Sequence, residues 1–363
     1  MSAHEILIAV MAAFAALGAI DRILGNRFGL GESFEEGILA MGTLALAMLG
    51  IIALAPVLAE ILNPVVVPVY RFLGADPAMF AGSILACDMG GGPLAQQMSN
   101  DPQSALMGGV LCGSMLGATI VFTIPVAMGI LKAEDHPAMA KGILAGIVTI
   151  PAGLLVGGLV AGFPVGMVLR NLIPIVLMGA LIAVGLIFAE KAMIKGFGIF
   201  GKGVIILITI GLGAAIVEEL TGFQIIPGMA SLEEGFATVG AIAIVLAGAF
   251  PLVKVITKLL RKPLMALGKR LGINEVAAGG LIATLANSIA TFEQVKNMDD
   301  RGKVVNVAFA VSAAFVFGDH MGFTAGFAPE MLPAMIAGKL AGGVSAVAVA
   351  MLLTRQKNER MFP

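Results

Sequence analysis

The sequence has few charged residues and almost no cysteine. Only 12% of its 363 residues are Asp, Glu, Lys or Arg, and the net charge is −1. That share is about half of what a soluble domain carries, and the near-neutral balance gives no reason to expect a nucleic-acid partner. The two cysteines, Cys87 and Cys112, both lie in apolar segments. We interpret them as buried small hydrophobes rather than as part of a disulfide framework.

Histidine and the larger aromatic residues are equally scarce. His4, His136 and His320 are too scattered in the sequence to predict a metal site. No nucleophile–base signature appears, so we predict neither an enzyme nor a bound cofactor. The chain has no Trp and one Tyr, so that an aromatic cage for a cation would have to consist of phenylalanine. We predict an acidic and polar site instead.

Apolar runs are what the sequence has in abundance. Hydrophobic residues make up 59% of the chain, and the mean hydropathy is +1.01. Runs of about 20 residues recur from end to end, long enough to cross a hydrocarbon core of ~30 Å as helices, and their continuity excludes a porin-like barrel. The first 24 residues carry Glu5 and lack a basic segment, which favours a retained helix over a signal peptide. The chain is predicted to be an all-α polytopic membrane protein.

Several motifs occur twice, in the same order and at nearly the same spacing. Residues 33–50 (SFEEGILAMGTLALAMLG) match residues 231–248 (SLEEGFATVGAIAIVLAG), and residues 72–84 match residues 270–282. The order and spacing of these matches predict an internal repeat. The predicted parts are a first repeat over 1–160, a linking helix and loop over 161–198, a second repeat over 199–354 and a short cytoplasmic tail over 355–363.

The distribution of lysine and arginine between loops predicts the number of spans. If the segments 78–98 and 276–295 turn back inside the membrane, nine spans cross it, and 19 loop Lys and Arg lie on one side against 2 on the other. If both segments cross, eleven spans result and the bias disappears. The positive-inside rule favours nine, with a periplasmic N-terminus and a cytoplasmic C-terminus. Four spans and one linking helix then make the second repeat inverted, as in many secondary transporters.

One of these turning segments contains an acid and a helix breaker. In LACDMGGGPL (85–94), Asp88 is followed by Gly90, Gly91 and Pro93. Ionisable residues within a membrane are costly and call for a partner or a function, and broken helices occur there only around a cavity or inside protein. We predict that Asp88 binds substrate, with backbone groups of Gly90 and Gly91 beside it. A helix cap at a tight packing turn is the alternative.

The matching segment of the second repeat, GLIATLANSIATFEQ (280–294), has neutral polar groups at this place. Asn287 and Ser288 follow the position equivalent to Asp88, and they are expected to bind a hydroxyl. Gln96 and Gln294 correspond to one another and could each supply an amide, or could lie at solvated segment ends.

An acid and a histidine stand together in the second repeat only. Asp319 and His320 lie in AAFVFGDHMGFTAG, an apolar run interrupted by glycines. A histidine titrates near neutral pH, so this pair could bind substrate, respond to pH or neutralise itself locally.

Several longer segments resemble the ethanolamine permease family of the ethanolamine-utilisation operon. They are FEEGILAMGTLALAMLG, VPVYRFLGADPAMFAGSILACDMGG, GSMLGATIVFTIPVAMGI and KGILAGIVTIPAG. The resemblance covers nearly the whole chain and is strongest over 34–160. It implies uptake of ethanolamine across the bacterial inner membrane to supply a cytoplasmic ammonia-lyase pathway. Asp88 would pair with the ammonium, and Asn287, Ser288 or a backbone group would bind the hydroxyl.

Other functions stay open at this point. A transporter for another small cation or polar metabolite is the nearest alternative, ahead of a channel or a membrane-embedded enzyme. The expected partners are the small substrate and the lipid bilayer, and a homo-oligomer is compatible with the sequence.

Overall fold

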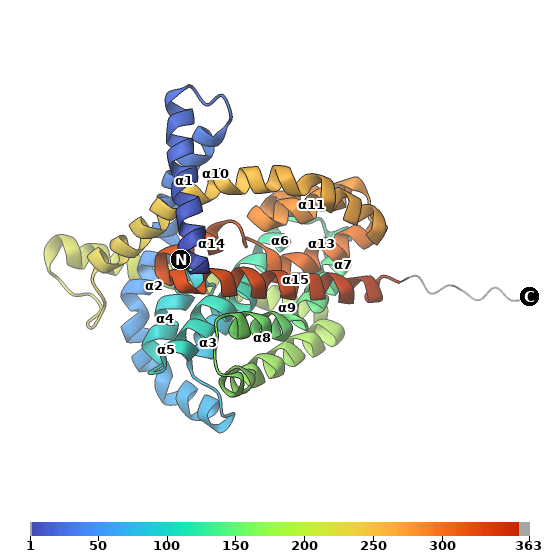
Figure 1. Cartoon of the computed structure of the whole chain (residues 1–363). Coiled ribbons are helices and arrows are strands. Elements are labelled where there is room, and N and C mark those ends of the chain that lie inside the picture. Colours follow the sequence, from blue (N-terminus) through green and yellow to red (C-terminus); the bar gives the residue numbers. More distant parts are fainter. Residues whose placement is uncertain (1, 356–363) are drawn as a thin grey trace, which may run out of the picture.

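The chain folds entirely as helices over the part that is described. The computed structural model describes residues 2–355, so most of the predicted tail, from residue 356 onward, lies outside this range (Figure 1). The helices of the first half are α1 (Ala3–Ile23), α2 (Leu30–Phe72), α3 (Ala78–Ile84), η1 (Cys87–Met89), α4 (Gly91–Met98), α5 (Pro102–Leu106), η2 (Met107–Gly117), η3 (Thr119–Thr123), α6 (Ile124–Ile130), η4 (Ala133–Asp135), α7 (His136–Ile147) and α8 (Ile150–Val160). The remainder are α9 (Val165–Thr221), α10 (Leu232–Leu271), α11 (Glu275–Ala286), α12 (Ser288–Gln294), η5 (Val295–Asn297), α13 (Asp300–Ala313), α14 (Asp319–Phe327), η6 (Pro329–Met331) and α15 (Leu332–Leu353).

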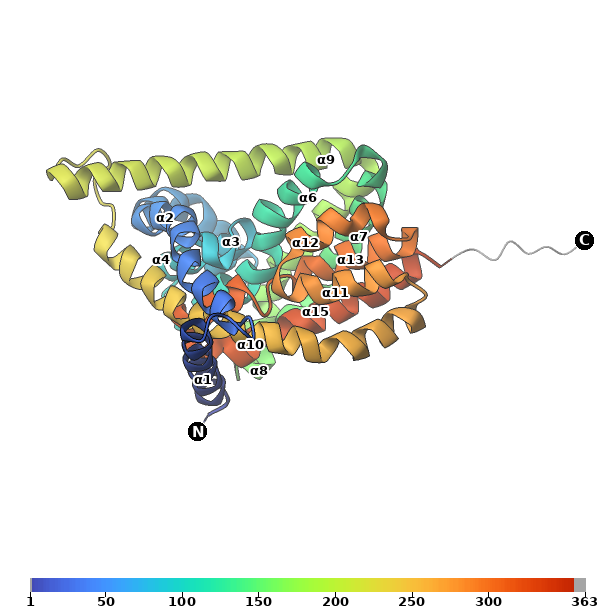
Figure 2. The same ribbon diagram turned by 90° about the horizontal axis from the view of Figure 1, so that it is seen from above.

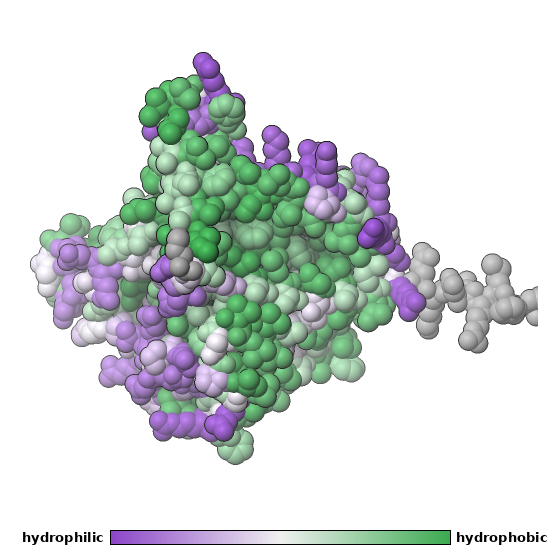
Figure 3. Space-filling model, in the orientation of Figure 1, coloured by the Kyte–Doolittle hydropathy of each residue, from purple (hydrophilic) through white to green (hydrophobic). Residues whose placement is uncertain are grey.

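Many of these helices suit a membrane by their length and composition. Within the described residues, 7 helical segments are long and apolar enough to cross it: α1, α2, 102–130, 133–160, α9, α10 and 329–353. Hydrophobic residues cover most of the face shown in Figure 3, and hydrophilic residues gather at its lower left and along its upper right edge. The chain is therefore a multi-pass helical membrane protein, as the composition predicted.

The longest helix contains the linking segment and the start of the predicted second repeat. α9 has 57 residues, and its C-terminal part runs along one edge of the molecule (Figure 2). At 1.5 Å per residue it would be ~85 Å long if straight, far more than one membrane thickness. Its backbone leaves the helical region at Ala189 (φ −143°, ψ 42°). A kink at Ala189, inside the segment predicted as a linking helix and loop, therefore separates two helical parts.

Four helices pack together through close glycine contacts. α2 packs along α10, α1 packs against both, and the C-terminal part of α9 packs against α2. A Cβ atom added at Gly50 of α2 would overlap the carbonyl of Ile208 on α9, and one added at Gly248 of α10 would overlap the carbonyl of Met11 on α1. The two glycines stand at the spacing of the predicted repeat. Small residues at such crossings let helix backbones approach closely.

Three segments interrupt their helices in the interior of the molecule. α3 and α4 are separated by extended backbone at Leu85 and Ala86, and α11 and α12 are separated by extended backbone at Asn287. Both breaks fall where the sequence predicts turning segments. The third break, between α13 and α14, includes Phe315 at a φ of 61°. It was not predicted, because the apolar run from 304 to 317 has the composition of a continuous helix.

The second and third breaks satisfy one another's backbone groups. The amide N–H of Phe315 donates to the carbonyl of Thr284 at 3.1 Å, and that of Phe317 donates to the carbonyl of Leu285 at 2.9 Å. Both acceptors belong to the last turn of α11, which has no helical partner for them. Unpaired backbone groups are very costly in an apolar environment. The two interruptions therefore stabilise one another and hold residues 286–288 beside residues 315–319.

A largely buried ion pair joins the start of α13 to η4, which directly precedes α7. Lys303 Nζ lies 2.6 Å from Asp135 Oδ1, and the Asp135 side chain is 2% exposed. We expect Asp135→Ala to lower the free energy of unfolding by about 1–3 kcal/mol, because it removes a charged hydrogen-bond partner of Lys303, whose side chain is 18% exposed. Glu134→Ala is the control, since Glu134 is exposed and pairs with Lys132 at 3.7 Å. Thermal unfolding in detergent measures both, and equal melting temperatures would contradict the prediction.

Candidate functional site

The break between α3 and α4 carries Asp88 into the interior. Asp88 lies in the short turn η1, and its side chain keeps only 15% of its accessible surface. Gly90 follows at a φ of +90°, and a Cβ atom there would overlap the side chain of Ile51 on α2. A glycine is required for both reasons. Gly91 starts α4, and its amide N–H donates to the carbonyl of Ala86 at 2.9 Å, so that the turn is closed on itself.

A small cavity adjoins the Asp88 carboxylate. It has a volume of about 150 Å³ and lies between α2 and the broken helices. Its walls are formed by Thr43, Leu44, Ala47, Ala86, Asp88, Met89, Ala118, Phe122, Phe315, Asp319 and His320. Three predicted site residues from two distant parts of the sequence, Asp88 in one and Asp319 with His320 in the other, therefore meet at one cavity.

The histidine faces the first carboxylate across a short gap. His320 Nε2 lies 3.8 Å from Asp88 Oδ1, too long for a direct hydrogen bond but within ion-pair distance. The other ring nitrogen, Nδ1, is buried and has no hydrogen-bond partner among the described residues. The ring packs on Phe315, with centroids 5.3 Å apart, and Phe315 contacts Phe122 edge-on at 5.4 Å. The site thus combines acids with an aromatic wall, which the expectation of a purely acidic and polar site did not include.

A second cavity of about 360 Å³ shares one wall with the first. Asp319 lines both, and it stands at the N-terminus of α14 directly after the third break. Asn287 lines the larger cavity, where Lys254 of α10 and Glu36 of α2 also contribute. The Asn287 side-chain oxygen accepts the amide N–H of Ile289 at 2.8 Å and so caps α12. Its side-chain NH₂ group remains available as a donor.

The other predicted residues are not part of this arrangement. Gln96 and Gln294 are exposed and line neither cavity, and the Gln294 side-chain oxygen accepts a hydrogen bond from Asn297 at 3.1 Å. Ser288 is fully buried and also lines neither cavity, and its hydroxyl has no partner among the described residues. The exposure of both glutamines agrees with the alternative that they lie at solvated ends of their segments.

One residue of the site was missed in the sequence. Lys339, in the middle of α15, is fully buried, and its ammonium donates to the carbonyl of Ser114 on η2. Ser114 follows Gly113, which packs closely against Cys87, so the ammonium lies next to the turn that carries Asp88. The available signal was a single lysine within the apolar helix 332–353, the same kind of signal that identified Asp88.

The fold also brings together three groups that bind metals in other proteins. One ligand atom each of Cys87, Asp88 and His320 lies within 4.8 Å of the others. The scattered histidines gave no hint of this cluster, since only one of them takes part. The ammonium of Lys339 next to these groups disfavours a divalent cation and favours a site of low net charge.

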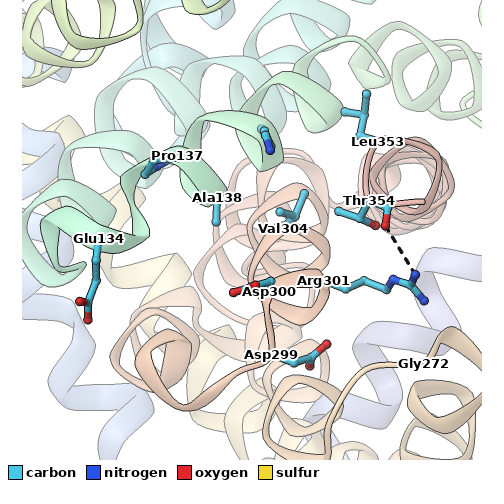
Figure 4. Close-up of a pocket in the computed structure, with 11 residues that line it drawn as sticks. Glu134, Pro137, Ala138, Gly272, Asp299, Asp300, Arg301, Val304, Leu353 and Thr354 are labelled. Atoms are coloured by element: carbon cyan, nitrogen blue, oxygen red, sulfur yellow. Dashed lines mark hydrogen bonds between the residues drawn. The ribbon is translucent and has the colours of Figure 1, made fainter. Parts of the chain in front are cut away.

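A larger pocket of about 710 Å³ has a different character. It lies at the surface between α7, α13 and the end of α15, and Figure 4 shows Asp299, Asp300, Arg301 and Thr354 on its wall. Arg301 donates a hydrogen bond to the carbonyl of Thr354 at 3.5 Å. None of the predicted site residues lines it. Substrate sites of secondary transporters lie near the middle of the membrane, so the small interior cavity is the better candidate.

Comparisons with known proteins point to one family. A family model described as "Ethanolamine utilisation protein, EutH" matches residues 3–353. The "Probable ethanolamine permease EutH" of Listeria monocytogenes serotype 1/2a (strain 10403S) is 62% identical over 98% of this chain and 95% of its own length. The protein of the same name from Escherichia coli (strain K12) is 47% identical over 99% of this chain and 97% of its own length. The "Uncharacterized protein YxeR" of Bacillus subtilis (strain 168) is 54% identical over 98% and 96%. No solved structure matches.

Proposed function

This chain belongs to the EutH family of ethanolamine utilisation proteins, and from that membership we propose that it transports ethanolamine, in its protonated form, into the cell. The observation that carries the proposal is the small interior cavity with two carboxylates, Asp88 and Asp319, on its wall. Its volume of about 150 Å³ is several times the ~30 Å³ occupied by a water molecule. Ethanolamine has four non-hydrogen atoms, so the size is suitable.

The chemistry of the wall suits the two ends of ethanolamine. The ammonium would pair with Asp88. Among the described residues, no cationic group donates a direct hydrogen bond to this carboxylate. Thr43 is the hydroxyl-bearing residue on the cavity wall and would bind the alcohol, while Asn287 would contact the substrate in the larger cavity. For four atoms at a ceiling of about 1.5 kcal/mol each, the binding free energy reaches ~6 kcal/mol, or tens of micromolar.

Two cavities that share a wall support a route through the protein. Lys254 lines the larger cavity and belongs to the strongly basic stretch of α10, which the positive-inside rule assigns to the cytoplasmic side. The substrate would then leave the Asp88 cavity past Asp319 toward the cytoplasm. In alternating access, the helices around the cavity close this route when the opposite one opens.

The helices also support the nine-span topology that the loop charges predict. The kink at Ala189 divides α9 into two parts of spanning length, and the broken pair α13–α14 supplies one more crossing segment. Added to the other six apolar helices, these make nine spans. We propose an inverted repeat in the bacterial inner membrane, with the N-terminus in the periplasm and the C-terminus in the cytoplasm.

The test is uptake of labelled ethanolamine into proteoliposomes at an acidic and an alkaline external pH. We expect uptake to saturate as the ethanolamine concentration rises. At a fixed concentration, we expect uptake to be faster at acidic pH, where the amine is protonated. Uptake that rises linearly with concentration would indicate a channel. No uptake at either pH, or uptake that follows the neutral amine, would contradict transport of the ammonium form. Competition with choline, glycerol and ethylamine tests the alternative of another small cation or polar metabolite.

A further inference from the structure

The position of Lys339 has a consequence for which substrates the site accepts. Among the described residues it is the only fully buried lysine or arginine, with 0% of its surface exposed. A buried ammonium is costly unless opposite charge lies near it. Its one hydrogen bond goes to a neutral backbone carbonyl, that of Ser114. The compensating charge must therefore come from the carboxylates of the neighbouring site.

The packing of η2 places this ammonium next to the Asp88 turn. Ser114 follows Gly113, and a Cβ atom added at Gly113 would lie only 3.0 Å from the backbone nitrogen of Cys87. The carbonyl that holds the lysine thus belongs to the stretch of η2 that contacts the turn η1. Asp88, which follows Cys87 in that turn, lines the same cavity as Asp319. The three charges form one cluster, although they come from three separate parts of the sequence.

Counting these charges gives the net charge of the empty site. Asp88 and Asp319 share the cavity wall and carry two negative charges, the neighbouring Lys339 carries one positive charge, and His320 adds none in its neutral form. In the adjoining cavity the charges of Glu36 and Lys254 cancel one another. One negative charge is left over. A substrate with a single positive charge neutralises the cluster, whereas a neutral molecule leaves the excess carboxylate buried, and a dication adds an excess positive charge. Uncompensated charge in a low-dielectric interior is strongly unfavourable.

We infer that Lys339 is a specificity-determining residue: by neutralising one carboxylate it sets the site to accept monocations and to reject diamines. This inference deepens the proposed function and rests on the ammonium being the recognised group. The lysine does not contact the substrate. It acts through the charge of the Asp88–Asp319 pair.

A pair of compounds that differ in charge but hardly in shape tests the inference. 3-Amino-1-propanol and 1,3-diaminopropane have the same length, and at neutral pH the first carries one positive charge and the second carries two. We expect Lys339→Met to reduce uptake of ethanolamine and 3-amino-1-propanol by about 10-fold or more and to give saturable uptake of 1,3-diaminopropane. Uptake that keeps the wild-type preference for monocations in a folded Lys339→Met protein would overturn the inference.

A second substitution that restores the net charge of the cluster distinguishes a role of Lys339 in specificity from a purely structural role. Asp319→Asn alone leaves no net charge and is expected to impair uptake of both compounds. The double variant Lys339→Met/Asp319→Asn returns the cluster to one negative charge, and it should recover monocation uptake relative to Asp319→Asn. This comparison holds even if Lys339→Met alone does not fold. A double variant that is monodisperse and no better than Asp319→Asn would show that the lysine serves only to hold Ser114.

The wild-type protein distinguishes failure of this inference from failure of the proposed function. Wild-type uptake of ethanolamine together with unchanged selectivity in the variants contradicts only the role of Lys339. If the wild type carries neither ethanolamine nor 3-amino-1-propanol, the proposed function fails, and the inference fails with it.

Discussion

Asp88→Asn is expected to abolish saturable uptake of ethanolamine while the protein remains folded and inserted. The substitution keeps the size of the side chain and removes the charge that would pair with the ammonium. Loss of one partner of a buried charge pair costs 2–5 kcal/mol or more, which corresponds to a reduction of at least ~30-fold in affinity. Transport assays in proteoliposomes and binding of labelled ethanolamine in detergent measure the two consequences separately.

A matched control for this variant exists elsewhere in the chain. Asp300→Asn removes a carboxylate that is exposed and lines the surface pocket of Figure 4. It should leave uptake unchanged, because exposed charges contribute little to an interior site. If Asp88→Asn transports as the wild type does, Asp88 is only part of a tight turn, and Asp319 with His320 becomes the candidate ammonium site.

The second large effect concerns folding and follows from the glycine contacts of α2 and α10. Gly50→Ala and Gly248→Ala each place a methyl group onto the backbone of a neighbouring helix. Such overpacking costs about 1–3 kcal/mol when side chains adjust, and a backbone contact allows less adjustment. We expect both variants to have clearly lower melting temperatures in detergent and reduced yield of monodisperse protein.

Each of these variants has a control on its own helix. Gly42 of α2 and Gly240 of α10 have nothing within 4 Å of an added Cβ atom. Gly42→Ala and Gly240→Ala should leave stability unchanged or raise it slightly, because alanine favours a helix by up to about 1 kcal/mol. Equal melting temperatures for Gly50→Ala and Gly42→Ala would show that α2 does not cross α9 at Gly50.

Signals in the sequence were sufficient for the class of protein and for two of the three breaks. Long apolar runs indicate membrane helices whatever surrounds them, because the cost of exposing them to water depends on their own composition. Asp88 with its glycines likewise marks an interruption that neighbouring residues explain, and the internal repeat extends that prediction to the matching segment around Asn287. The break at Phe315 carried no such mark. Its backbone groups are satisfied by carbonyls of α11, some 30 positions earlier in the chain, which local composition does not show.

The sequence by itself therefore determined that this is a helical membrane protein of the ethanolamine permease type, with Asp88 in an interrupted helix. Tertiary structure alone decided which polar groups meet. It placed His320 within 3.8 Å of Asp88, set Asp319 between two cavities and left Gln96 and Gln294 outside. It also made Lys339 part of the site, because α15 packs against η2 and η2 against η1. Hydrophobicity is a property of each segment, whereas the pairing of charges depends on distances between segments that are fixed only by packing.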